Sequence, residues 1–147
     1  MRVVSIRKSE LQKFSADKEM VQKSGRPCVL IVRLKYKGKR YDFAVPLRSN
    51  INPSTPKKDY FPLPANKTTK PKHRHGIHYA KMFPVDRTAL LRYRTDGNPF
   101  ATMIKGVIDK NEKQIIAECQ QYLNDYAKGI RTKYSTDIDL LISIMSK

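Results

Sequence analysis

Apolar and basic residues alternate in the N-terminal third of the chain, as they do in antiparallel strands. Residues 28–36 are rich in β-branched side chains and end in alternation, and residues 39–45 resume the pattern after Lys37–Gly38. Two such segments joined by a two-residue turn predict a β-hairpin. A short apolar run at residues 3–6 predicts a first strand before the hairpin.

Residues 48–75 follow a different pattern, because five prolines and many small polar residues interrupt them. We expect no regular element there, and a loop of this length in a small domain is usually functional or disordered. Within it, residues 67–75 are nearly all cationic or polar. Residues 76–84 then predict a strand that ends at Pro84.

Beyond Asp86 the apolar positions recur at helical spacing. Asn98 followed by Pro99 predicts a helix start, because asparagine caps a helix and proline suits its first position. Asn111 and Gln114 indicate a second start. The expected helical positions are Leu11 and Phe14 after a Ser9 cap; Leu90, Leu91 and Tyr93; Ile115, Cys119, Tyr122 and Tyr126 up to Gly129; and Ile138, Leu141, Ile142 and Met145 after a Ser135 or Thr136 cap.

These patterns predict a single α+β domain over residues 1–147. Strands dominate its N-terminal half and helices its C-terminal third, so we expect helices packed against a strongly bent, twisted antiparallel sheet.

The charge balance changes the functional picture. The chain has 30 Lys and Arg against 13 Asp and Glu, a formal net charge of +17. Such an excess predicts a polyanionic partner, because each phosphate that a cation neutralises releases condensed counterions. A membrane is not favoured, since no apolar run approaches the ~18 residues of a spanning helix. Without the apolar core of a signal peptide near the N-terminus, the expected location is the cytoplasm.

The cations that we expect to bind RNA fall on the hairpin and on the proline-rich loop. The RNA-binding candidates are Arg33, Lys35, Lys57, Lys58, Lys67, Lys70, Lys72 and Arg74.

The two cysteines, Cys28 and Cys119, lie far apart in the sequence and inside apolar patterns. They indicate reduced core residues, so no zinc site is expected.

The sequence carries no metal-binding or nucleotide-binding signature, and we expect no cofactor. RNA can be cleaved without a metal ion, because its own 2′-hydroxyl is the nucleophile. The reaction then needs a base, an acid for the leaving 5′-oxygen, and donors to the phosphate oxygens. Candidates for these roles surround the loop and are Arg48, Ser49, His75, His78 and Lys81.

Each candidate also has a structural interpretation. His73 and Arg74 suit a solvated arm that holds phosphate. His75 stands at a strand entrance, where a structural role and catalysis are equally open. His78 lies mid-strand between apolar residues and is either a core histidine or a proton-transfer group. Ser49 before Asn50 is either a turn cap or a catalytic donor.

Four segments resemble the ToxN/AbiQ family of type III toxins, in matching order along most of the chain. A hairpin with a central glycine, residues 36–41 (YKGKRY), runs into residues 44–49 (AVPLRS), which are similar to the family's Pro-Leu-x-Ser stretch. Residues 76–84 (GIHYAKMFP) resemble its glycine entrance, asparagine strand and Met-Ile-Pro. Residues 98–100 (NPF) resemble its Pro-aromatic helix start. The resemblance is closer to the CptN and TenpN branches than to ToxN.

The resemblance implies a PemK/MazF-like twisted sheet, partly barrel-shaped, with added helices. It implies sequence-specific RNA cleavage that leaves a 2′,3′-cyclic phosphate and a 5′-hydroxyl, with cellular mRNA as substrate. It also implies inhibition by a small structured RNA antitoxin, which the toxin cuts from tandem repeats and with which it assembles.

Residue by residue, the resemblance gives Ser49 the role of the active-site serine. His78 replaces the strand asparagine of the family, and Arg48 stands where the family has threonine. Ile51 takes the place of a functional lysine, a role that Lys57, Lys58 or Lys81 could fill, and Ser9 and Glu10 stand where some members have a tyrosine.

Two other functions compete with this one. A non-catalytic, basic RNA-binding protein would use the same cations, and only cleavage of RNA in the presence of EDTA separates the two. A DNA-binding regulator is less favoured, because no helix-turn-helix spacing is present and sheets with exposed tyrosines suit single-stranded RNA.

Overall fold

The predicted hairpin forms the centre of the fold. The computed structural model describes residues 2–19, 29–92 and 98–146. Strands β2 (Val29–Tyr36) and β3 (Lys39–Ile51) pair antiparallel from Tyr36 opposite Lys39 to Val29 opposite Pro46. Lys37 and Gly38 both have positive φ, 50° and 83°. Positive φ at both central residues is the geometry of the tight turn that matches strand twist, so the turn prediction is confirmed.

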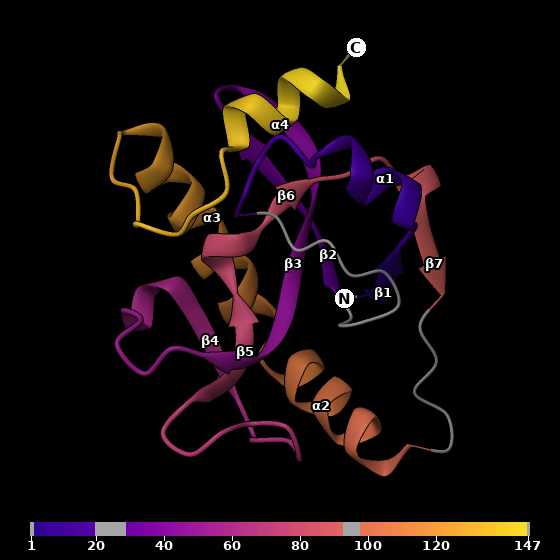
Figure 1. Ribbon diagram of the computed structural model, residues 1–147, viewed down its shortest axis with the longest axis vertical. Helices are drawn as coiled ribbons and strands as arrows, with labels where there is room; N and C mark the ends of the chain where they lie inside the picture. Colours follow the sequence, from indigo (N-terminus) through magenta and orange to yellow (C-terminus); the bar gives the residue numbers. More distant parts are fainter. Residues whose placement is uncertain (1, 20–28, 93–97, 147) are drawn as a thin grey trace.

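The described strands form one antiparallel sheet in the order β4-β5-β3-β2-β1-β7, with β6 paired to β3 (Figure 1). β3 extends six residues past its predicted end and contacts β2, β5 and β6. The remaining strands are β1 (Arg2–Ile6), β4 (Tyr60–Leu63), β5 (Arg74–His78), β6 (Phe83–Pro84) and β7 (Leu90–Arg92).

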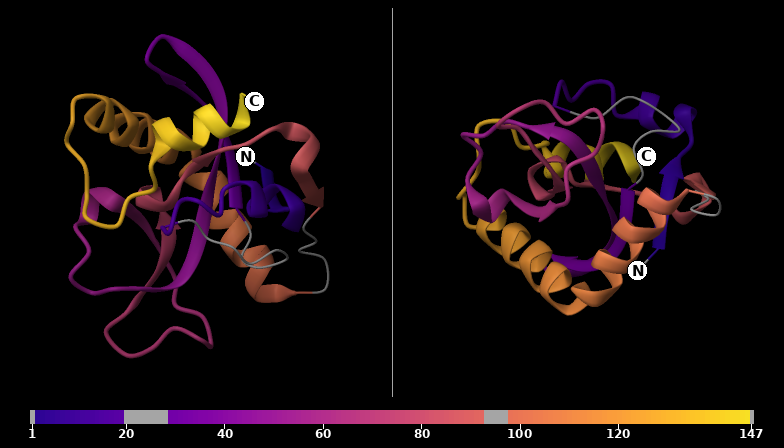
Figure 2. Two further views of the ribbon diagram at one scale, coloured as in Figure 1. Left: turned by 45° about the horizontal axis from the view of Figure 1, so that its top comes forward. Right: turned by 90° about the horizontal axis from the view of Figure 1, so that it is seen from below.

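Helices cover both faces of the sheet (Figure 2). On one face, α2 (Pro99–Lys110) and α3 (Glu112–Ala127) pack Ile108, Ile115 and Cys119 against the apolar side of β2 and β3. The opposite face has a smaller core, in which Phe83 and Ala44 meet apolar residues of β1, α1 (Lys8–Lys13) and α4 (Ile138–Met145). The α+β prediction with mainly C-terminal helices is therefore confirmed, and burial raises the pKa of the Cys119 thiol, as expected for a core cysteine.

Three of the expected element assignments were wrong. β4 lies inside the proline-rich segment that was expected to lack regular structure, as do the end of β3 and the start of β5; β4 is an edge strand, where a proline such as Pro62 is tolerated. Residues 76–84 form two strands separated by the 3-10 turn η2 (Tyr79–Lys81). Leu90 and Leu91 lie in β7, not in a helix, after the 3-10 turn η3 (Arg87–Ala89).

The helix caps were predicted with mixed success. Asn98 accepts a hydrogen bond from Ala101 N–H at 3.1 Å and Pro99 begins α2, as predicted. Asp137, not Ser135 or Thr136, caps α4, because its carboxylate accepts from Leu140 N–H. Ser9 lies inside α1 and does not cap it. Cys28 and Tyr93 lie outside the described residues. No helix in the described ranges is long and apolar enough to cross a membrane.

Candidate active site

The pairing of β3 with β5 brings the candidate catalytic residues together. Arg48 lies opposite Gly76, and Leu47 lies opposite Ile77. Residues opposite one another in an antiparallel pair share a face, and residues two apart on a strand do too, so Arg48 and His78 lie on the same face. The register shifts between Arg48 and Ile51, and Ser49 lies in this irregular stretch.

His78 is the most constrained of these residues. Its side chain is 7% exposed, and its Nδ1 has no hydrogen-bond partner among the described residues. Burial, with the positive charges of Arg48 and Lys81, lowers the pKa of His78 from 6.5 to about 3. The imidazole is therefore neutral at physiological pH and keeps a free ring nitrogen, unlike a core histidine whose polar atoms are satisfied.

Lys81 reaches the same region because the strand ends before it. β5 stops at His78, and the η2 turn redirects the chain, so the alternation of faces in a continuous strand does not apply to Lys81. The charge of Lys81 acts on His78 and contributes to lowering its pKa. Its side chain is buried and its Nζ lies 2.5 Å from Glu19 Oε2. Burial lowers the pKa of Arg48, and the charge of Glu19 opposes that shift. Glu19, which the sequence did not indicate, is thus a counterion shared by both cations.

Ser49 is oriented by Asn66, a residue that the sequence also did not single out. Asn66 Nδ2 donates to Ser49 Oγ at 2.8 Å. Asn66 Oδ1 accepts from Thr68 N–H at 2.9 Å, which fixes the amide orientation because a backbone N–H cannot donate to an amide nitrogen. Since Ser49 Oγ accepts from Asn66, its own hydroxyl proton is left to donate elsewhere.

Asn50 ties the cationic loop to the same strand. Its Nδ2 donates to Thr68 O at 3.0 Å, and its Oδ1 accepts from Lys70 N–H at 2.7 Å. The loop over residues 64–73, here called the lysine loop, therefore has a fixed anchor beside Ser49. Its predicted RNA-binding residues Lys67, Lys70 and Lys72 are all exposed, as is Arg74 at the start of β5.

His75 lies on the other face of β5, away from Arg48 and His78. Its Nδ1 is 2.7 Å from Pro64 O, and its ring stacks on Phe100 with the centroids 6.1 Å apart. It is 7% exposed. These contacts hold His75 between the lysine loop and α2, so the structure does not bring it together with the other candidates.

The hairpin cations lie at the far end of β3. Arg33 contacts Asp42 at 3.4 Å, and Asp42 also pairs with Arg87 at 2.9 Å. Asp42 and Ser49 are seven positions apart on β3, or roughly 20–25 Å at the rise of a strand. Lys35 is exposed on β2, where its backbone contacts Gln120 of α3. Arg33 and Lys35 are thus separate from the His78 cluster, whereas Lys57 and Lys58 line a cavity beside β4.

Comparison with solved structures identifies the fold. Over 99% of this chain and 95% of the other, it matches AbiQ, a lactococcal anti-phage endoribonuclease of the type III toxin-antitoxin system, with a TM-score of 0.73 and 15% identity. A ToxN structure, from work on a processed non-coding RNA that regulates a bacterial antiviral system, matches over 97% of this chain and 96% of the other, with a TM-score of 0.71 and 15% identity. The chain has the ToxN/AbiQ fold.

At 15% identity this match concerns the arrangement of the backbone. No protein-family model and no curated protein matches the sequence. The ToxN/AbiQ resemblance, carried by four short segments, is thus confirmed at the level of the fold. The roles of Ser49, Arg48, His78 and Lys81 depend on their own geometry.

Proposed function

We propose that the chain is the toxin of a type III toxin-antitoxin system and cleaves RNA as a metal-independent endoribonuclease. The observation that carries the proposal is the cluster in which an unpartnered, neutral His78 imidazole lies near Arg48 and Lys81, with Ser49 at the adjoining strand irregularity. The ToxN/AbiQ fold supports it, because AbiQ is an endoribonuclease of this system.

In the proposed reaction, neutral His78 accepts the proton of the RNA 2′-hydroxyl. The 2′-oxygen attacks phosphorus, and the bond to the 5′-oxygen breaks, giving a 2′,3′-cyclic phosphate and a 5′-hydroxyl. Arg48 and the Ser49 hydroxyl donate to the phosphate oxygens, on which negative charge grows. Lys81, which keeps two N–H donors beyond its bond to Glu19, gives a proton to the leaving oxygen.

A phosphate bound between Arg48 and Lys81 would also make His78 a stronger base. The two cations contribute to the low pKa of His78, and a phosphate anion offsets their charge. The pKa of His78 would therefore be lowest in the free protein and would increase when RNA is bound. His75 has a structural role in this scheme, because it lies on the opposite face.

The proposed partners are RNAs. Cellular mRNA is the substrate, and a small structured RNA, cut from tandem repeats by the toxin, is the antitoxin that assembles with it into a protein–RNA oligomer in the cytoplasm. The ToxN structure comes from work on a processed non-coding RNA, which supports this assignment. Short tandem repeats followed by a terminator are expected just upstream of the gene.

The test is incubation of the purified protein with RNA in EDTA. We expect defined cuts whose downstream fragments accept a 5′-phosphate from polynucleotide kinase directly, because they end in a hydroxyl. The His78→Ala variant, purified in the same way, controls for a contaminating nuclease. RNA binding without cuts would favour the non-catalytic RNA-binding function, and fragments with 5′-phosphates would exclude attack by the 2′-hydroxyl.

A further inference from the structure

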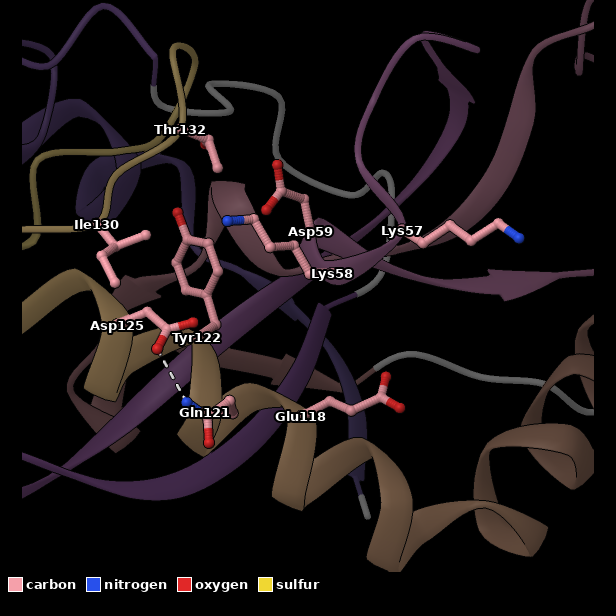
Figure 3. Close-up of a pocket in the computed structure, with 9 residues that line it drawn as sticks. All are labelled: Lys57, Lys58, Asp59, Glu118, Gln121, Tyr122, Asp125, Ile130 and Thr132. Atoms are coloured by element: carbon pink, nitrogen blue, oxygen red, sulfur yellow. Dashed lines mark hydrogen bonds between the residues drawn. The ribbon is translucent and has the colours of Figure 1, made fainter.

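A second polar site lies at the outer edge of the sheet, apart from the His78 cluster. A cavity of about 300 Å³ opens between the 3-10 turn η1 (Lys57–Asp59), α3 and the segment that follows α3 (Figure 3). This volume is at the lower end of the range in which proteins hold small organic groups. The residues that matter for its chemistry are Lys58, Asp59, Glu118, Tyr122, Asp125 and Thr132.

Asp59 is the unusual member of this set. It is 2% exposed, yet its Oδ1 has no hydrogen-bond partner among the described residues. The other two carboxylates of the cavity are already engaged: Glu118 accepts from the Tyr79 hydroxyl at 2.7 Å, and Asp125 accepts from Gln121 at 2.9 Å. A buried acceptor without a donor costs free energy, so a partner that donates to Asp59 would be stabilising.

Two further hydroxyls lie at the same cavity. The Tyr122 hydroxyl and Thr132 Oγ1 are buried without a well-formed hydrogen bond to a described residue, although Thr132 and Ser135 lie close enough to Tyr122 to oppose the increase in its pKa. In the view of Figure 3, the Lys58 ammonium lies between the Tyr122 hydroxyl and the Asp59 carboxylate. Burial raises the pKa of Asp59, and the charge of Lys58 opposes this increase. Burial also raises the pKa of Tyr122, and the charge of Asp59 adds a smaller increase, which agrees with this proximity.

The charges of the cavity restrict what it can bind. A phosphate would meet Asp59, Glu118 and Asp125, and a cation would meet Lys58, so neither ion is well matched. A neutral, planar group with both donors and acceptors fits better. The ring of Tyr122 and the exposed side chain of Ile130 provide surfaces on which such a group could stack. In a protein with a net charge of +17, a nucleobase of RNA has these properties.

The donor and acceptor pattern selects one base. Guanine has two adjacent N–H donors on its Watson–Crick edge, so it can donate two hydrogen bonds to one carboxylate while its O6 accepts from a lysine. Adenine and cytosine each place a ring acceptor beside their amino group, and uracil has one donor between two acceptors. We infer that the Asp59 cavity is a guanine-binding site, in which Asp59 accepts from the base and Lys58 donates to O6.

The location suits an RNA strand that also reaches the proposed active site, and to this extent the inference rests on the proposed function. Tyr60, the residue after Asp59, is paired with His78 across β4 and β5. β4 is the edge strand, and Asp59 precedes it on the side covered by α3. An RNA that passes around this edge could hold a guanine in the cavity and a neighbouring phosphate near His78.

Binding can be measured without cleavage by using single-stranded RNA in which 2′-O-methyl groups replace the nucleophile. Oligonucleotides that differ at one position, guanine, inosine or adenine, are compared by fluorescence anisotropy. Inosine lacks the 2-amino donor and therefore loses one bond to Asp59. We expect guanine to bind roughly ten- to hundredfold more tightly than adenine, with inosine between them. Equal affinity for all three bases would overturn the inference.

Asp59→Asn should remove this preference, because an amide offers one acceptor where the carboxylate offers two. Asp125→Asn is the matched control: it removes the same charge from the same cavity at a carboxylate that already has a donor, and the preference should remain. Lys58→Met, at an exposed position, weakens guanine binding without a change in the core. A folded Asp59→Asn protein that still prefers guanine would contradict the inference.

Two further measurements complete the test. The first asks whether the bound base belongs to a free nucleotide or to RNA, and the second distinguishes failure of the guanine-binding inference from failure of the proposed nuclease function. If the site serves free nucleotides, guanosine monophosphate binds the parent protein and not Asp59→Asn; if it serves RNA, the monophosphate competes poorly with the oligonucleotide. Binding of the monophosphate supports a guanine site; without it, the base preference of the oligonucleotides decides for or against the site. Cleavage of RNA that lacks guanine should survive Asp59→Asn, so loss of the guanine preference and loss of nuclease activity are scored separately.

Discussion

The His78 cluster and the lysine loop carry the same sign of charge in opposite environments. His78 and Lys81 are buried and Arg48 is partly buried, held by β3, β5 and η2. The lysines of the loop are exposed, and the loop is anchored by hydrogen bonds through Asn50 and Asn66 and by the contact of Pro64 with His75.

This difference in burial separates two uses of positive charge. In the cluster, burial changes the protonation equilibria of the side chains: it lowers the pKa of His78 and that of Arg48. In the loop, salt screens each charge beyond a Debye length of about 10 Å at 0.1 M, so it attracts phosphate without fixing its position. We therefore expect the cluster to determine reaction rate and the loop to determine affinity.

The largest expected effect comes from His78→Ala, which should slow single-turnover RNA cleavage by roughly 10²–10⁴, the usual contribution of general acid–base catalysis. RNA affinity measured by anisotropy should change little, because the neutral imidazole contributes no charge. His78→Gln keeps a hydrogen-bond donor but cannot accept a proton for transfer. Full activity in the glutamine variant would make His78 a positioning residue, like the strand asparagine of the ToxN/AbiQ family that it replaces.

The same residue predicts the acid limb of the pH–rate profile. As a base, His78 must be neutral, and its pKa in the free protein is lowered to about 3. The profile of kcat/KM, which reports the free enzyme, should therefore not lose activity between pH 6.5 and about pH 4 through His78. An acid limb near pH 6.5 that disappears in His78→Gln would show that the imidazole titrates as if it were exposed.

Ser49→Ala should reduce cleavage by roughly 10²–10³, the cost of removing one donor to a developing oxyanion, with binding nearly kept. Asn66→Ala should have a smaller effect in the same direction, since it frees the Ser49 hydroxyl from its fixed orientation. Asn50→Ala is the control, because it releases the loop without a contact to Ser49. Wild-type cleavage by Ser49→Ala would leave Ser49 with a purely structural role.

A smaller effect concerns stability. Between pH 6.5 and about pH 3 the unfolded chain binds a proton at His78 that the folded chain does not. Stability due to this group is therefore lost as the pH falls through that window, on the order of 1.4 kcal/mol per pH unit. Urea denaturation of the parent and of His78→Gln, compared from about pH 7 to pH 4, isolates the effect. If the unfolding free energies of the two proteins change in the same way with pH, this prediction is wrong.

The smallest effect separates the loop from the cluster. Reversing Lys67, Lys70 and Lys72 to glutamate should flatten the log–log salt dependence of RNA affinity by about 2, at about 0.7 per phosphate contact. Single-turnover cleavage at saturating RNA should be unchanged. Reversal of three exposed lysines elsewhere, Lys110, Lys113 and Lys128, controls for net charge. An unchanged slope in the loop variant would mean that the loop does not touch phosphate.

The sequence predicted the parts of this protein that depend on local patterns. Alternation and Lys37–Gly38 were enough for the hairpin, and Asn98 was enough for the start of α2. β4 was missed because prolines usually break strands, and only its place at the sheet edge makes Pro62 acceptable. β7 was missed because three residues show no periodicity.

The same division holds at the site. His78 was indicated by its residue type and by the strand expected to carry it, and Arg48 by its charge and its place just after the hairpin. Glu19, Asn66 and Asp59 were not, because each matters through a contact with a residue distant in sequence: Lys81, Ser49 and the α3 side of the cavity. Side-chain chemistry can be read from a sequence, whereas the choice of partner depends on the fold.

Gly76 shows how little freedom the fold leaves at one position. A Cβ there would lie 2.5 Å from the carbonyl oxygen of Phe61, so any other residue would push β4 away from β5. Arg48 lies opposite this glycine, and the Asp59 cavity lies just before the strand that would move. The absence of a side chain at Gly76 thus determines how closely β4 packs beside β5, and with it the distance between the His78 cluster and the Asp59 cavity. Substitutions around Gly76 are therefore expected to be tolerated far better than substitution of Gly76 itself.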